Sequence, residues 1–141
     1  MVSVNRILLV LLVLMSPAFV SADVIEIDNA ALQKLKDSGA TIIDVRRDDE
    51  WLHTGILEGS HGITFFDKRG RYDVNAWLSD LDKLIKPDQP VVLICARGVR
   101  SSKIAELLDK RLGYSQVHNV TDGIQSWLKS DLPVVPWSPP Q

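Results

Sequence analysis

The sequence predicts an α/β fold, with a central, mainly parallel sheet of five strands and helices on both faces. Three observations predict it. Short runs rich in β-branched residues alternate with segments whose apolar residues recur at helical spacing. The run "VVLI" at 91–94 is apolar throughout, as in a strand covered on both faces. Strands joined through helices imply right-handed crossovers, so we expect functional groups at the carboxyl ends of the strands.

Local signals locate the individual elements. Asp28 is placed to cap a first helix that "DSGA" ends, and Pro87 marks the end of a helix over 73–86. A further helix begins near Ser101 and ends at Gly113, and "GIQSWL" begins the last one. The expected strands are 24–27, 41–45, 62–65, 91–94 and 116–120.

The chain divides into a leader, one domain and a short tail. Arg6 closes a basic start, Ile7 to Met15 is an unbroken apolar run, and Val20, Ser21 and Ala22 provide a signal-peptidase site. We therefore expect residues 1–22 to be a secretory signal peptide, and the mature protein to be exported, in a bacterium to the periplasm. A permanent membrane anchor is the alternative, although the apolar run is short for one. Residues 23–133 form the expected domain and 134–141 a surface tail.

Composition excludes several classes of protein. With 18 acidic and 16 basic residues, the chain has a formal net charge of −2, which offers no attraction to nucleic acid. No contact with a membrane is expected after cleavage. The single cysteine excludes an internal disulfide, a CxxC redox pair and a multi-cysteine metal site. The histidines share no metal-ligand spacing, so neither a metal nor another cofactor is expected.

The single cysteine, Cys95, ends the apolar strand and opens the segment "CARGVRSS". Gly98 permits a sharp turn between this strand and the following helix. Free amide groups of the turn and of the helix start can then converge on the sulfur. Together with Arg97 and Arg100 they favour the thiolate, which is the nucleophilic form. A buried, inert cysteine is the alternative, but it would not need two arginines and a glycine within five residues.

Three stretches of the chain resemble the single-domain rhodaneses, a family of sulfurtransferases. The cysteine segment resembles their CxxGxR or CxxGxT loop, "IIDVRRDDEW" at 42–51 resembles their IDVRxxxEY segment, and "LGYSQVHNVTDGIQSW" at 112–127 resembles their GFxxVxxLxGGxxxW segment. The matches occur in the family's order. The chain departs from the family at Ile56, where histidine is common, and at Asp122, where the first glycine of a pair is usual.

The resemblance implies a rhodanese-like fold and a reaction through a Cys95 persulfide. Sulfur would pass from thiosulfate or a similar small donor to a thiol or cyanide, or to a protein acceptor. The implied active-site loop comprises Cys95, Ala96, Arg97, Gly98, Val99, Arg100 and Ser101. Arg97 is our candidate for holding the donor's sulfonate oxygens. Arg100 is expected either to face the substrate or to brace the loop through a carboxylate.

Other polar and aromatic residues receive supporting roles. Asp44 and Arg46 end the second strand, and we expect an ion pair between Arg46 and Glu50, four residues later, rather than direct catalysis. Trp51 is a candidate for the rim of the site. "NVT" at 119–121 matches a glycosylation acceptor.

Two other classes of function remain open. A cysteine and an arginine in an anion-binding loop also occur in phosphatases and arsenate reductases, but their loops carry five residues between the two, and here there are four. The second alternative is a non-enzymatic sulfur carrier or a thiol sensor.

Overall fold

The computed structural model describes residues 23–140. The expected signal peptide, residues 1–22, lies outside the described residues, so it stays a prediction. Five strands form one sheet in the order β1-β5-β4-β2-β3, and all four pairings are parallel. The strands are β1 (Ile25–Ile27), β2 (Thr41–Asp44), β3 (His61–Gly62), β4 (Val91–Ile94) and β5 (Val117–Val120). The predicted sheet is thus confirmed.

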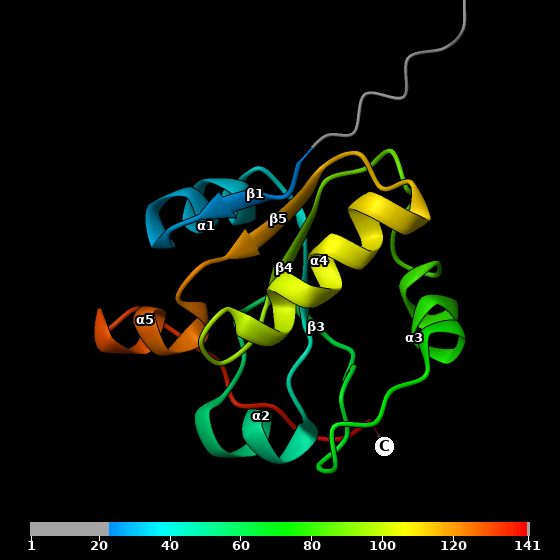
Figure 1. The fold of residues 1–141 in the computed structure, drawn as a ribbon. Helices are drawn as coiled ribbons and strands as arrows, with labels where there is room; N and C mark the ends of the chain where they lie inside the picture. Colours follow the sequence, from blue (N-terminus) through cyan, green and yellow to red (C-terminus); the bar gives the residue numbers. More distant parts are fainter. Residues whose placement is uncertain (1–22, 141) are drawn as a thin grey trace, which may run out of the picture.

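Helices cover both faces of this sheet, as the sequence predicts. They are α1 (Asn29–Asp37), α2 (Asp48–Thr54), α3 (Val74–Leu81), α4 (Val99–Leu112) and α5 (Gly123–Lys129). Figure 1 shows α4 lying across the central strands. One core cluster joins α3 and α4 to one face of the sheet, and a second joins α1 and α5 to the other. None of the helices described is long and apolar enough to cross a membrane.

Several helices begin and end at the residues that the sequence predicts. The Asp28 carboxylate accepts a hydrogen bond from the Ala31 amide at 2.9 Å, and Asp73 caps α3 in the same way. Gly113 ends α4 in the left-handed conformation. Helix α3 is shorter than the predicted 73–86, because its continuation tightens into bonds to the third preceding residue, such as Leu84 N–H to Leu81 O at 2.9 Å.

The third strand differs most from its prediction. Residues 62–65 were expected to be extended, but β3 is only His61–Gly62, paired with Ile43 and Asp44. The neighbouring strand β2 ends at Asp44, so no regular ladder remains for the following residues. The predicted surface tail is held in place by an antiparallel bridge between Val135 and Ile56, with N–H to O distances of 2.9 Å in both directions.

Two glycines with positive φ test how tightly this fold packs. Gly123 has φ +61°, and a Cβ there would overlap the main chain of Ala96. Gly113 has φ +74° but open space around it. We predict that Gly113→Ala lowers the free energy of unfolding by about 1 to 2 kcal/mol, the cost of the left-handed conformation alone. Gly123→Ala should cost at least twice as much in urea unfolding, and equal losses would contradict the close contact.

Candidate active site

Cys95 lies directly after β4, in the middle of the sheet, and a tight turn through Gly98 leads from it into α4. We call residues 95–101 the cysteine loop. The strands β2 and β5 lie on either side of β4, so the carboxyl ends of both flank the loop, and Asn119 of β5 contacts it. This is the edge of the sheet where the sequence places the functional groups.

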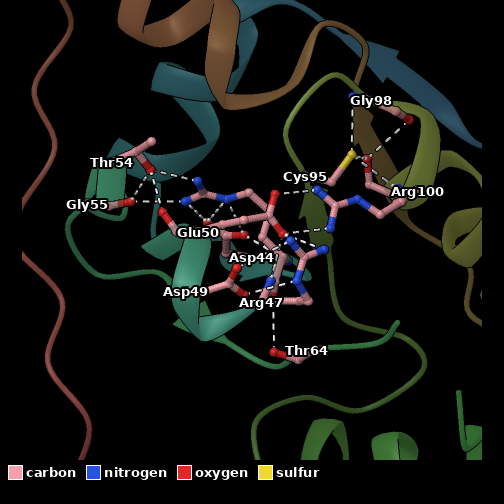
Figure 2. A network of polar contacts seen from close by, with 12 residues as sticks. Asp44, Arg47, Asp49, Glu50, Thr54, Gly55, Thr64, Cys95, Gly98 and Arg100 are labelled. Carbon is pink, nitrogen blue, oxygen red and sulfur yellow. Dashed lines mark hydrogen bonds and ion pairs between the residues drawn. The ribbon is translucent and has the colours of Figure 1, made fainter. Parts of the chain in front are cut away.

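Three donors converge on the cysteine sulfur (Figure 2). The Gly98 amide lies 3.2 Å from Sγ, the Ser101 hydroxyl 3.2 Å, and the Ser101 amide 3.5 Å. Cys95 is only 1% exposed. Donors that point at a buried sulfur stabilise negative charge on it, whether it is a thiolate or carries a further atom.

The main chain of the β5–α5 turn fixes the shape of this loop. The Ile124 amide donates to the Cys95 carbonyl at 2.9 Å, and the Gln125 amide donates to the Ala96 carbonyl at 3.1 Å. Gly98 has φ +85°, and a Cβ at this position would overlap the carbonyl oxygen of Thr121. Glycine is therefore required at residue 98 by both conformation and space.

Arg100 braces the loop against α2. Its guanidinium donates two hydrogen bonds to the Glu50 carboxylate, at 2.7 and 2.8 Å (Figure 2). Burial alone would raise the pKa of Glu50, but the hydrogen bonds and charges of Arg100 and Arg47 lower it to about 2. The hydrogen bond to Glu50 in turn raises the pKa of Arg100, against the effect of burial. Arg100 was expected either to face the substrate or to brace the loop through a carboxylate, and the structure shows the contact with a carboxylate.

The predicted ion pair between Arg46 and Glu50 is wrong. Arg46 instead pairs with Asp44 at 2.7 Å, and both side chains are almost fully buried. Arg46 also donates to Thr54 Oγ1 at 2.7 Å and to the Gly55 carbonyl at 2.9 Å. The Arg46 side chain extends past Glu50 because these acceptors lie at the end of α2. They accept the hydrogen bonds of a guanidinium that is too buried to bind water.

The remaining loop residues face outward or line cavities. Arg97 and Val99 are exposed, whereas Ala96 is half-buried. Ala96 lines a cavity of ≈ 490 Å³ between α2 and α5, to which Glu50 and His53 also contribute. Arg97 lines a neighbouring one of ≈ 370 Å³ together with Lys129. Among residues 23–140, no group of His, Cys, Asp or Glu side chains could hold a metal ion.

Burial contradicts the expected place of Trp51 at the rim and rules out the glycosylation match. Trp51, a candidate for the rim, is only 4% exposed and packs beside Gly62 and 5.0 Å from the Trp137 ring. Asn119, in the glycosylation match, is 2% exposed because it lies within β5, so no glycan could be attached to it in the folded protein.

Sequence reasoning missed the residues of β1 and β5 that reach the loop. Asn119 donates to the Gly98 carbonyl at 3.4 Å and to the Glu26 carboxylate at 2.9 and 3.1 Å. Only the polar residues between the two valines of the strand "VHNV" could have indicated this contact. Its partner on β1 depends on strand order, which local patterns do not reveal.

Comparisons with known proteins agree with this geometry. The model of the rhodanese-like domain family matches residues 28–130. A thiosulfate sulfurtransferase GlpE of Actinobacillus pleuropneumoniae is 27% identical, over 74% of this chain and 85% of that protein. Thiosulfate sulfurtransferase 18 of Arabidopsis thaliana is 27% identical, over 79% and 84%. The crystal structure of a rhodanese-related protein from Thermoplasma volcanium superimposes with a TM-score of 0.61 at 30% identity, covering 80% of this chain and 99% of that one.

The contact between Glu50 and Arg100 makes stability depend on pH. Because the pKa of Glu50 falls from 4.5 to about 2 on folding, its contribution is complete above pH 4.5 and is lost as the pH falls through about 2. Glu50→Gln should therefore lower the free energy of unfolding by about 1 to 2 kcal/mol at pH 7. In urea unfolding, the difference from the wild type should shrink below pH 4.5. Asp80→Asn, which removes an exposed pair with Lys83, is the matched control; a pH-independent loss in Glu50→Gln would contradict the prediction.

Proposed function

Because this chain belongs to the family of rhodanese-like domains, we propose that it transfers sulfur through a persulfide on Cys95. The donor is thiosulfate or a similar compound with a sulfane sulfur, and the acceptor is thiophilic, such as a thiol or cyanide. The observation that carries the proposal is the convergence of the Gly98 amide and of the Ser101 amide and hydroxyl on a buried sulfur. The sulfurtransferase relatives support the same reaction class.

The first half-reaction loads the cysteine. The Cys95 thiolate attacks the outer sulfur of thiosulfate, a new sulfur–sulfur bond forms, and the bond to the sulfonate group breaks. Sulfite leaves with that electron pair. The persulfide carries a negative charge on its terminal sulfur, and we infer that the donors of the loop, which already converge on the Cys95 sulfur, stabilise it.

The second half-reaction returns the enzyme to its starting state. A thiolate or cyanide attacks the terminal sulfur, and the electron pair of the breaking bond returns to Cys95. No external oxidant or reductant is consumed. The persulfide cannot be resolved from within, because the chain has no second cysteine to form an internal disulfide with Cys95.

A cysteine-dependent phosphatase is less well supported. Only the four residues from Ala96 to Val99 separate Cys95 from Arg100, and both terminal nitrogens of Arg100 are engaged by Glu50. An arginine that clamps a phosphate needs those nitrogens for the phosphate oxygens.

Intact mass tests the loading step directly. The wild-type protein should gain the mass of one sulfur atom after incubation with thiosulfate, and added cyanide should remove it. Cys95→Ser should gain nothing. If the wild-type protein gains no sulfur while its thiol still reacts with iodoacetamide, thiosulfate is excluded as the donor. Hydrolysis of an aryl phosphate that is lost in Cys95→Ser would favour the phosphatase instead.

We further propose that Arg97 holds the oxygens of the donor, because it is an exposed cation on the cysteine loop beside Lys129. Removing one charge-assisted contact should raise the KM for thiosulfate roughly 10-fold or more in Arg97→Ala. The control is Arg69→Ala, an exposed arginine in a turn outside the site. Equal KM values in the two variants would exclude a donor-binding role for Arg97.

A further inference from the structure

The Asn119 side chain lies against the cysteine loop, and the proposed reaction does not use it. Its Nδ2 lies 2.9 and 3.1 Å from the two carboxylate oxygens of Glu26, and 3.4 Å from the carbonyl oxygen of Gly98. Its Oδ1 is buried and has no partner among the described residues. The amide therefore gives up one of its own hydrogen bonds in order to point its NH₂ group toward Glu26 and the loop.

Glu26 sets this orientation. It lies opposite Asn119 in the parallel pairing of β1 with β5. If the amide rotated by half a turn, Oδ1 would face a carboxylate, and two acceptors would repel each other. The Thr121 hydroxyl also donates to Glu26 at 2.8 Å, so a second donor holds the carboxylate in place.

The Gly98 carbonyl is where this network meets the cysteine. The oxygen accepts the Ser102 amide at 3.0 Å, the Asn119 amide at 3.4 Å and the Ser101 hydroxyl at 3.2 Å. A carbonyl oxygen has two lone pairs, so three donors compete for two places. The Ser101 hydroxyl has one proton and two acceptors at the same distance, the Gly98 carbonyl and the Cys95 sulfur, both at 3.2 Å.

From this competition we propose that Asn119, oriented by Glu26, is a positioning residue that directs the Ser101 hydroxyl proton to the Cys95 sulfur. With the Ser102 and Asn119 amides on the Gly98 carbonyl, both of its lone pairs are occupied. The Ser101 proton then has the sulfur as its remaining acceptor. The contribution of the hydrogen bond from Ser101 to the sulfur to catalysis rests on the proposed function. The bond itself affects every reaction of the Cys95 thiolate.

The pH dependence of alkylation measures the effect. The rate of reaction of Cys95 with iodoacetamide follows the thiolate fraction. One hydrogen bond to a charged group corresponds to a shift of about one to two pH units. We expect Asn119→Ala to move the midpoint of the profile upward by that amount, because the Ser101 proton returns to the Gly98 carbonyl. An unchanged midpoint in a folded Asn119→Ala protein would overturn the proposal.

For Glu26→Gln, the direction in which the midpoint shifts distinguishes two effects. Removing a negative charge should by itself favour the thiolate and lower the midpoint. Loss of the amide orientation should raise it, so we expect a net upward shift, and a downward shift would overturn the role of Glu26. Thr121→Val is the matched comparison, because it removes the other donor to Glu26 but leaves the carboxylate and the Asn119 contacts; its midpoint should move less than that of Glu26→Gln.

A double-mutant cycle shows whether the effect passes through Ser101. In a Ser101→Ala background, Asn119→Ala should produce no further shift, since no hydroxyl proton remains to be directed. Additive shifts would overturn the proposal. If Asn119→Ala does not fold, as judged by urea unfolding, Glu26→Gln replaces it in the cycle, at an exposed position. In the Ser101→Ala background its upward shift should disappear, which leaves only the downward effect of the removed charge.

The other charged groups around the loop are unchanged in the Asn119 variants. They lie on the loop, on β1, at the end of β2, on α2 and at the two ends of α5, and are Arg97, Arg100, Glu26, Asp44, Arg46, Asp49, Glu50, His53, Asp122 and Lys129. Alkylation needs no sulfur donor, so the two proposals can fail separately. If the protein takes up no sulfur from thiosulfate but shows the shifts, the role of Asn119 stands and the sulfur transfer does not. If it is loaded normally and shows no shifts, only the sulfur transfer stands.

Discussion

The packing of one main-chain segment directly on another determines the shape of this site. Gly98 and Gly123 let the cysteine loop and the β5–α5 turn approach until no Cβ fits between them. Amides of Ile124 and Gln125 then bond the carbonyls of Cys95 and Ala96. Because those carbonyls are occupied from behind, the loop's own amides are free to turn toward the sulfur. The β5–α5 turn thus shapes the surroundings of the Cys95 sulfur, although it contributes no donor to the sulfur itself.

Two ion pairs stabilise the side of the site formed by β2 and α2, and they differ in how deeply they are buried. The pair of Asp44 with Arg46 is buried and ties the end of β2 to the end of α2. The pair of Glu50 with Arg100 is partly exposed and ties α2 to the cysteine loop. In series they connect the sheet to the loop through one short helix. The position of the loop therefore depends on α2, which touches the sulfur with none of its side chains.

Local patterns were sufficient for the fold and for the cysteine loop, but not for the partners within the site. Alternating strands and helices, the cap at Asp28 and the stop at Gly113 are properties of neighbouring residues, so the sequence displays them. Besides Arg46 and Glu50, the segment 44–50 contains three aspartates and one arginine that could pair with one or the other. The choice depends on where Thr54, Gly55 and Arg100 lie in space. The predicted third strand was too long because its length depends on where β2 ends, and the role of Asn119 was missed because its partner Glu26 lies on β1, far away in the sequence.

The strand order also has a consequence for how the chain is made. β1 is at one edge of the sheet and pairs with β5, which is synthesised after every other strand (Figure 1). During translation β1 must therefore wait, unpaired, until nearly the whole domain has emerged. Contacts between segments so distant in sequence form slowly. The sheet is thus completed only after β5 has been made, and β1, the first strand to be made, is among the last to be paired.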